Sequence, residues 1–278
     1  MNDKVVFYFG AGGMSGVFGA GIGTELEESN IYSKIEAIYG CSAGAFNAAY
    51  FLARDSRLGS SIYWENLTDG RFINLRKVLR GNSNAMNIDH LVEVSRSSKV
   101  LNLDALRNQS IPFFVKVLNS RTGEVEYHDG KEDTFSKLKS SASMFPFYWD
   151  VNGQDFIDAS LREVIGLESL IRRHPENRIV LVINHQPRLT PAYVLQQYLT
   201  GTIAQFRRRD LPFFEYAREK VLAFKKDLER ALKDERVLLV HPPKESRTLP
   251  LTRDRTKLLE TYEMGILEAR EKILRFLG

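Results

Sequence analysis

A serine between glycines at residues 40–44 constrains this chain more than any other feature. The segment Gly40-Cys41-Ser42-Ala43-Gly44 has the form G-x-S-x-G. The apolar run 35–39 before it is typical of a buried strand, and the alanine-rich segment 43–53 after it is typical of a helix. A serine squeezed between a strand and a helix has a strained backbone, and its hydroxyl stands clear of the sheet at a helix N-terminus. The pattern therefore predicts a nucleophilic serine, Ser42; the alternative is a plain turn of small residues.

The same order of elements starts at the N-terminus. Residues 5–9 are apolar, β-branched or aromatic, as expected for a buried strand. A glycine-rich loop follows at 10–16, and residues 17–26 are typical of a tightly packed helix. Strand, helix, strand, elbow and helix in succession predict an α/β fold in which helices cover both faces of a parallel sheet. Because no long linker divides the chain, we expect a single domain over residues 1–278.

The remaining segments predict a mixture of strands and helices. Turn residues at 120–123 join two strand-like runs at 112–119 and 124–128. Further strands are predicted at 156–158, 178–184 and 236–240, and a loop at 81–84. Helices are predicted at residues 88–95, 103–107, 135–143, 191–234 with a break near 210–212, and 255–277, and the segment 161–173 is amphipathic. The chain is therefore expected to be mainly helical from about residue 190.

Composition narrows the classes of function. The 278 residues carry a net charge of +4, and the sequence pI is about 9.0. The basic residues are spread along the chain, which does not favour a nucleic-acid partner, whereas a weakly basic surface suits anionic lipid headgroups. Cys41 is the single cysteine, so no intramolecular disulfide can form, as in a reducing compartment. The N-terminus does not match a signal peptide, and no apolar run reaches the ~18 residues of a membrane span, so we expect a cytoplasmic protein.

Gly12 and Gly13 are the candidate oxyanion hole. Their loop follows the first strand and the elbow follows the second, so both are expected at the carboxyl edge of a parallel sheet. Glycines there let backbone N–H groups approach a tetrahedral intermediate. A dinucleotide-binding loop is the alternative, but Gly16 falls one place late for G-x-G-x-x-G and no acidic residue ends the second strand. Tyr216 and Lys220 form the Y-x-x-x-K pair of short-chain reductases, yet their charged helical segment favours a solvated face.

The base that would activate Ser42 can be a histidine, an aspartate or a lysine. None of the five histidines has a diagnostic context. His241 follows a predicted strand and would complete a Ser42–Asp158–His241 triad in the chain order of α/β-hydrolases. However, the elbow of that fold normally follows several strands, and here it follows the second.

Four ordered motifs resemble the patatin-like phospholipases. They are Gly12-Gly13-x-x-Gly16, the elbow segment 40–48, Ser141-Ala142-Ser143-x-x-Pro146, and Ile157-Asp158-Ala159-Ser160. The segments 178–184, 240–243 and 258–269 resemble the bacterial, single-domain branch of the family, so the resemblance covers nearly the whole chain. It implies a three-layer α/β/α fold with a mainly parallel central sheet.

The resemblance also implies the chemistry. Ser42 would be the nucleophile and Asp158 the proton acceptor of a Ser–Asp dyad without histidine, and Gly12 and Gly13 would form the oxyanion hole. The substrate would be a lipid acyl ester, hydrolysed through an acyl-enzyme. A carboxylate can act as sole base only if burial raises its pKa, which the apolar residues before Asp158 favour. No cofactor is implied, and no metal is expected because no residue cluster has metal-ligand spacing.

Departures from the family pattern leave a non-catalytic lipid-binding homologue as an alternative. Ser15 stands where family loops often have a basic residue, and Ala11 stands where they have a third glycine. Ala159 replaces a glycine beside the proposed base, so the local backbone there is open to change.

A basic and aromatic segment suggests a second kind of contact. Arg207-Arg208-Arg209 lies among Phe206, Leu211, Phe213, Phe214 and Tyr216. Such a segment is either a peripheral membrane contact or a charged helix end beside core aromatic residues. The sequence indicates neither the lipid preference nor the oligomeric state.

Overall fold

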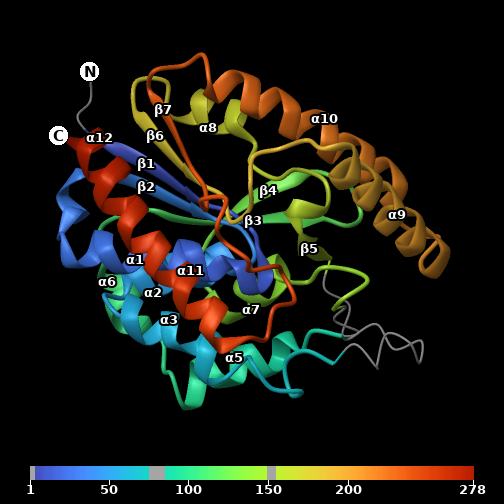
Figure 1. The fold of residues 1–278 in the computed structure, drawn as a ribbon, viewed down its shortest axis with the longest axis horizontal. Coiled ribbons are helices and arrows are strands. Elements are labelled where there is room, and N and C mark those ends of the chain that lie inside the picture. Colours follow the sequence, from blue (N-terminus) through green and yellow to red (C-terminus); the bar gives the residue numbers. More distant parts are fainter. Residues whose placement is uncertain (1–3, 75–84, 149–154) are drawn as a thin grey trace.

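The computed structural model describes residues 4–74, 85–148 and 155–278, and within them seven strands form one sheet (Figure 1). The strands are β1 (Val5–Phe9), β2 (Ile35–Gly40), β3 (Phe113–Asn119), β4 (Val125–Asp129), β5 (Phe156–Asp158), β6 (Arg178–Val182) and β7 (Val237–Val240). Their order is β4-β3-β2-β1-β6-β7, and β5 pairs with β3. Neighbours from β3 to β7 are parallel, whereas β4 and β5 run antiparallel to β3.

Helices lie on both faces of this sheet. The α-helices are α1 (Val17–Glu28), α2 (Ala43–Leu52), α3 (Ser56–Glu65), α5 (Ile88–Ser97), α6 (Leu103–Asn108), α7 (Thr134–Ser141), α8 (Leu167–Arg173), α9 (Pro191–Arg207), α10 (Phe213–Ala231), α11 (Arg255–Glu268) and α12 (Leu274–Leu277). The short turns are the 3-10 helices η1 (Gly13–Gly16), η2 (Ile31–Lys34) and η3 (Ala159–Leu161), and the π-helical turn η4 (Ala269–Ile273).

The pleat of the strands divides the interior into two cores. In β1, Val5, Phe7 and Phe9 pack into the core formed with α1, α2 and α11, and Val6 and Tyr8 pack into the core formed with α8 and α10. All five side chains are buried, as in a parallel strand that helices cover on both faces. Figure 1 shows α8 and α10 on one side of the sheet and α1, α2 and α11 on the other. The three-layer α/β/α fold is thereby confirmed.

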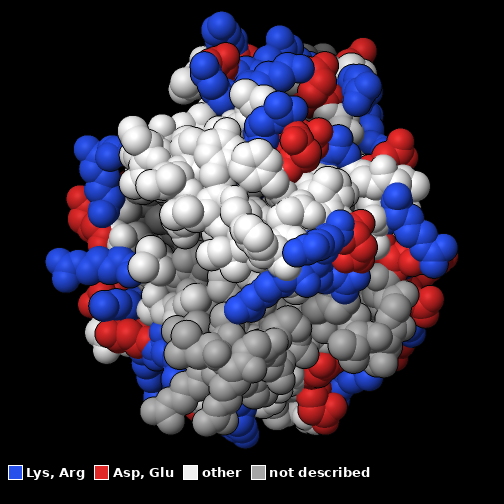
Figure 2. Space-filling view, turned by 90° about the vertical axis from the view of Figure 1, so that its right-hand side faces the viewer, with Lys and Arg blue, Asp and Glu red and all other residues white. Residues whose placement is uncertain are grey.

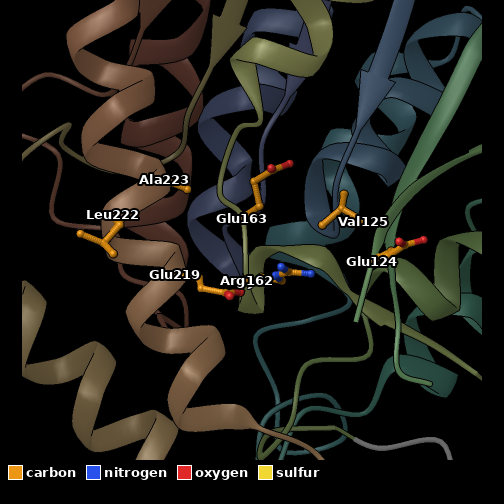
Figure 3. A pocket seen from close by; sticks show the side chains of 7 residues that line it. All are labelled: Glu124, Val125, Arg162, Glu163, Glu219, Leu222 and Ala223. Carbon is orange, nitrogen blue, oxygen red and sulfur yellow. Dashed lines mark hydrogen bonds and ion pairs between the residues drawn. The ribbon is translucent and has the colours of Figure 1, made fainter. Parts of the chain in front are cut away.

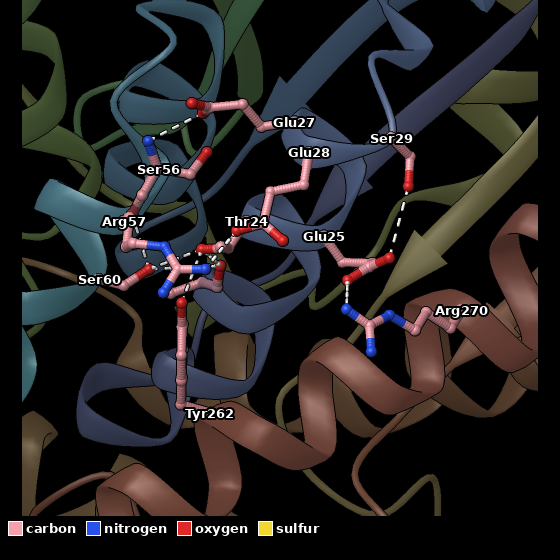
Figure 4. Close-up of polar contacts among 11 residues, drawn as sticks. Thr24, Glu25, Glu27, Glu28, Ser29, Ser56, Arg57, Ser60, Tyr262 and Arg270 are labelled. Carbon is pink, nitrogen blue, oxygen red and sulfur yellow. Dashed lines mark hydrogen bonds and ion pairs between the residues drawn. The ribbon is translucent and has the colours of Figure 1, made fainter.

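Close backbone approach joins α1 to α11. A Cβ on Gly21 would lie 2.1 Å from the carbonyl oxygen of Tyr262, and a Cβ on Gly265 would lie 2.2 Å from that of Phe18. Polar contacts then fix α1 laterally (Figure 4). The carboxylate of Glu25 pairs with Arg270 at 2.8 Å, so the C-terminal helical segment is attached to the first helix of the fold.

Most of the predicted elements are present. The strands at 5–9, 35–39 and 156–158, the strand pair around 120–123, and the long helices broken near 210–212 are confirmed. The amphipathic segment 161–173 is helical only from Leu167, because Gly166 adopts φ +82° immediately before it. α3 has no counterpart among the predicted helices. The predicted loop at 81–84 lies outside the described residues. No helix in the described part of the chain combines the length and apolar character that a membrane span requires.

Candidate active site

Ser42 occupies a strained turn between β2 and α2. Its φ and ψ are 54° and −126°, a left-handed region that a residue with a Cβ rarely adopts. The neighbours must be small. A Cβ on Gly40 would lie 2.5 Å from Cα of Ala45, and a Cβ on Gly44 would lie 2.1 Å from the carbonyl oxygen of Phe9. The strand, turn and helix predicted around Ser42 are therefore present, with glycines where backbone atoms leave no room for a side chain.

A buried hydroxyl holds this turn in place. The N–H of Ser42 donates to Oγ of Ser141 at 2.8 Å, and the same Oγ donates to the carbonyl oxygen of Lys116 on β3 at 2.8 Å. Ser141 is fully buried at the end of α7. It thus connects the elbow to the neighbouring strand. The sequence places Ser141 within a motif but does not predict its contact with Ser42.

The sheet brings Asp158 to the elbow. β3 pairs with β2 as far as Val115, which lies opposite Gly40. Two residues further along β3, Val117 pairs with Asp158 of β5. Because β4 occupies the other edge of β3 at Val117, β5 must lie on the same edge as β2. β5 therefore occupies the place beside β3 that β2 leaves when the chain turns at Ser42. Two segments more than a hundred residues apart in sequence meet there.

Asp158 is fully buried and only half satisfied. Its Oδ1 accepts the N–H of Ser160 at 2.8 Å and contacts Sγ of Cys41 at 3.5 Å. Within the described residues, Oδ2 has no hydrogen-bond partner. Burial raises the pKa of Asp158, whereas hydrogen bonding from Ser160 and Ser42 and the positive charge of Lys220 lower it. The influence of the Ser42 hydroxyl on the pKa of Asp158 indicates that the two side chains lie near each other.

The departure at Ala159 is accommodated without strain. Ala159 is fully buried at the start of η3, and its φ is not positive. The residue beside Asp158 therefore does not need to be a glycine in this chain.

Two amides of the glycine loop are free. Nδ2 of Asn184, at the end of β6, donates to the carbonyl oxygens of Gly10 (2.7 Å) and Ala11 (3.3 Å). The carbonyl of Gly12 accepts Oγ of Ser15 at 2.7 Å. Because C=O and N–H of a trans peptide point in opposite directions, the N–H groups of Gly12 and Gly13 point away from these contacts. Across the described ranges, neither N–H has an acceptor.

The glycine loop lies against the elbow. A Cβ on Gly16 would lie 2.6 Å from Cβ of Ala43, the residue after Ser42. At Gly13, φ is +53°, and a Cβ would lie 2.7 Å from the carbonyl oxygen of Pro250. Gly13 thus needs to be a glycine for both conformation and space. Asn184, which shapes the loop, was not identified from the sequence, although it is a polar residue ending an apolar strand.

His241 does not lie beside the elbow. β7, which precedes it, is three strands from β2 in the sheet, a separation of about 14 Å at ~4.8 Å per strand. Nδ1 of His241 is 2.9 Å from the carbonyl oxygen of Pro242. The structure therefore does not bring the three members of the alternative triad together.

Lys220 is a correction to the sequence analysis. The prediction of a solvated face for Tyr216 and Lys220 was wrong, because Tyr216 is buried and Lys220 is half-buried on the same side of α10, between Ala217 and Phe224. Burial lowers the pKa of Lys220, and the negative charge of Asp158 opposes this shift. In the part of the chain that the structure describes, its ammonium group has no hydrogen-bond or ion-pair partner. The helical spacing of apolar residues around position 220 was the signal that could have revealed this.

A pocket of about 520 Å³ lies between the start of β4, the residues that follow η3, and α10 (Figure 3). Glu124, Arg162, Glu163 and Glu219 supply its charged side chains, of which Arg162 pairs with Glu219 and Glu163 pairs with Lys116. Neither Ser42 nor Asp158 lines it. Among the described residues, no group of His, Cys, Asp and Glu side chains is arranged to hold a metal ion.

Comparison with known proteins identifies the family. The family model described as patatin-like phospholipase matches residues 7–171, which is more than half of the chain. The chain therefore belongs to this family. As a member it is an enzyme, a lipid acyl hydrolase. No curated protein matches the sequence. Among solved structures, VipD from Legionella pneumophila superposes with a TM-score of 0.49 and 12% identity, covering 100% of this chain and 67% of that one.

Proposed function

We propose that this chain hydrolyses lipid acyl esters with Ser42 as nucleophile and Asp158 as the proton acceptor, while the N–H groups of Gly12 and Gly13 bind the oxyanion. One observation carries the proposal. Asp158 is fully buried beside the elbow, where β5 pairs with the same edge of β3 as β2 does. Its Oδ2 has no hydrogen-bond partner in the described ranges. An unpaired carboxylate oxygen near a serine hydroxyl is equipped to accept its proton.

In the acylation step, Oγ of Ser42 attacks the ester carbonyl carbon as its proton passes to Oδ2 of Asp158. The tetrahedral intermediate collapses when the C–O bond to the alcohol breaks, and the protonated Asp158 gives its proton to the leaving alkoxide. This leaves an acyl-enzyme ester on Ser42 and a carboxylate at Asp158.

In the deacylation step, water attacks the acyl-enzyme and gives a proton to Asp158. The second tetrahedral intermediate releases the fatty acid, and the proton returns to Oγ of Ser42. No proton, electron or atom is left over, so the cycle needs only water and ester.

Burial explains how a carboxylate can serve without a histidine. An aspartate in water has a pKa of about 3.9 and is a weak base at neutral pH. Desolvation raises the pKa of Asp158, which brings its basicity nearer to the working range. The hydrogen bond from the N–H of Ser160 keeps the rise limited, so the group can still be ionised before it takes the serine proton.

The glycine loop supplies the electrostatic part. Two free N–H groups directed at a developing oxyanion act where charge appears, and each such donor is typically worth roughly 3 kcal/mol of barrier. The hydrogen bonds from Asn184 and Ser15 to the loop carbonyls support this role, because they fix the peptide planes before substrate arrives.

Kinetics on a short p-nitrophenyl ester test the proposal. Ser42→Ala and Asp158→Asn should each abolish hydrolysis, since one removes the nucleophile and the other the base. His241→Ala should keep wild-type activity. Full activity in either of the first two variants would refute the dyad, and loss of activity in His241→Ala would favour the triad instead.

Three further features belong to this proposal. The substrate is a phospholipid, lysophospholipid or other lipid ester, met at a membrane surface by peripheral contact. Residues 1–278 act as one domain, which is supported by β6 and β7, since both lie beyond the family match and still pair within the sheet.

A further inference from the structure

α9 carries an apolar stripe that the rest of the described chain leaves uncovered. Leu195, Leu199, Ile203 and Phe206 are 59%, 54%, 51% and 76% exposed. With 3.6 residues per turn, the four side chains fall within an arc of about 80° on the helix. Large exposed apolar side chains elsewhere in the described chain are scattered, so this concentration sets α9 apart.

The opposite side of α9 fixes the helix to the body of the protein. Gly201 and Ala204 are its buried residues, and they are separated from the stripe by roughly 100–180° around the helix. A Cβ on Gly201 would be 2.8 Å from Cβ of Ala217, so α9 approaches α10 closely there. The stripe therefore points outward because the other side of the helix is held.

The charges at the C-terminal end of the stripe are mainly basic. Residues 191–206 of α9 contain no Asp, Glu, Lys or Arg, although 27% of the whole chain is charged. Three arginines follow directly; Arg208 pairs with Asp210, and Arg207 and Arg209 are exposed. Figure 2 views this end of the molecule and shows a broad area without acidic or basic side chains, with charged side chains around its border.

We propose that the α9 surface, formed by Leu195, Leu199, Ile203 and Phe206, docks on membranes that contain anionic lipid. The stripe enters the boundary between headgroups and acyl chains, and the arginines at its C-terminal end contact the phosphates. The proposal deepens the lipid hydrolase function above and rests on it for the substrate, because α9 packs on α10, and α10 contacts η3 directly after Asp158.

The size of the patch favours a membrane over a second copy of the chain. If each side chain has at most the area of an aromatic one, on the order of 200 Å², the four expose no more than roughly 500 Å² at the fractions given above. A stable dimer buries about 800 Å² on each partner. A lipid surface requires no shape complementarity, and its anionic headgroups match the arginines.

The basic and aromatic segment around Arg207–Arg209 has two interpretations from its sequence, and in the structure each applies to a different part of the segment. Phe206 and Phe214 are 76% and 43% exposed, whereas Leu211, Phe213 and Tyr216 are buried in the core. The segment thus contributes Phe206 to the α9 surface, leaves Phe214 exposed at the start of α10, and uses Leu211, Phe213 and Tyr216 for packing.

Sedimentation with vesicles tests the proposal. The Ser42→Ala variant is used throughout, so that hydrolysis does not alter the lipid. We expect this variant to bind phosphatidylcholine vesicles that contain about one third phosphatidylglycerol. Adding Leu199→Ser and Ile203→Ser should weaken this binding at least tenfold. Arg207→Gln with Arg209→Gln should weaken binding to these vesicles and reduce its sensitivity to salt. Equal binding by the Leu199/Ile203 variant would overturn the proposal.

A matched control uses exposed leucines elsewhere. Leu232 and Leu267 are 84% and 53% exposed at the end of α10 and on α11. Changing both to serine should leave vesicle binding unchanged; an equal loss would show that α9 is not the docking surface. Sedimentation velocity without lipid gives a second check, because a dimer that dissociates in the Leu199/Ile203 variant would show that a second copy covers the stripe.

The docking surface and the catalytic proposal can fail separately. With Ser42 restored, the Leu199/Ile203 variant should hydrolyse a soluble p-nitrophenyl ester at the wild-type rate, since that substrate needs no membrane. Vesicle binding without any ester hydrolysis by the wild type would refute the dyad and leave the α9 surface standing. Hydrolysis of the soluble ester without vesicle binding would do the reverse.

Discussion

Replacing Ser141 with alanine should weaken the elbow without removing any reacting atom. The hydroxyl of Ser141 accepts the N–H of Ser42 and donates to the carbonyl of Lys116, both at 2.8 Å. Alanine keeps the backbone and the helix but leaves the buried N–H of Ser42 without an acceptor. Ser141 is therefore a positioning residue, which acts on the reaction through the conformation of Ser42.

The size of the effect follows from these contacts. A buried donor left without a partner costs about 1–3 kcal/mol, and the left-handed conformation of Ser42 itself costs about 1–3 kcal/mol. With the hydrogen bond gone, one of the contacts that offset the strain at Ser42 is lost. If the whole loss falls on the transition state, kcat decreases roughly 5- to 150-fold. KM should change little, since both hydrogen bonds of the hydroxyl are to protein.

Thermal unfolding measures the loss of stability, and steady-state kinetics on a soluble ester measure the decrease in kcat. Ser143→Ala is the matched control. Ser143 is equally buried two residues away, but its hydroxyl donates only to the carbonyl of Lys139 at 2.9 Å, one helical turn back. The control should keep its kcat. If Ser141→Ala keeps wild-type stability and kcat, or if Ser143→Ala loses as much kcat, the hydrogen bond does not hold the elbow.

Four other substitutions probe packing and charge. Gly21→Ala should destabilise strongly, because its Cβ would lie 2.1 Å from a backbone oxygen of α11, whereas Gly23→Ala, with its nearest atoms at 3.8 Å, should raise the free energy of unfolding by about 0.5–1 kcal/mol. Lys220→Met should move the acidic limb of the kcat/KM profile to higher pH, because the lysine charge lowers the pKa of Asp158. Burial raises the pKa of Asp227 from 3.8 to about 6, so its contribution to stability is present below about pH 4 and is lost as pH rises to about 6, and Asp227→Asn should flatten that slope.

Each of these has a contrary outcome. Equal thermal stability of the two glycine variants would mean that α1 and α11 are not in close contact. If the acidic limb stays in place or moves to lower pH in Lys220→Met, the charge of Lys220 does not lower the pKa of Asp158. The free energy of unfolding is measured by chemical denaturation between pH 4 and 6. If its slope against pH is the same for the wild type and Asp227→Asn, Asp227 does not cause the pH dependence.

Local pattern was sufficient for the elements but not for the contacts between them. The apolar run at 5–9 and the glycine spacing around Ser42 specify a strand and a tight turn through sterics and burial alone, and both are present. The meeting of Asp158 with Ser42 depends on β5 joining the edge of β3 beyond β2. That pairing is a property of the whole sheet, so no local periodicity encodes it, and only the family resemblance connected the two residues in advance.

Lys220 shows where composition misled. Many charged residues surround it, which favoured a solvated face, but the apolar positions at Phe213, Tyr216, Ala217 and Phe224 have helical spacing and define a buried stripe that includes position 220. The period of the apolar residues carried more information than the average charge. The hydroxyl of Ser141 could not be assigned its partner from the sequence, since the N–H that it accepts lies 99 residues away.

Labelling with a fluorophosphonate, followed by mapping of the mass shift by peptide mass spectrometry, tests the central claim most directly. Wild-type protein should carry one adduct, on Ser42, and Asp158→Asn should be labelled far more slowly because its serine has lost the base. An unlabelled Ser42 in folded wild-type protein, or an adduct on a different serine, would contradict the account.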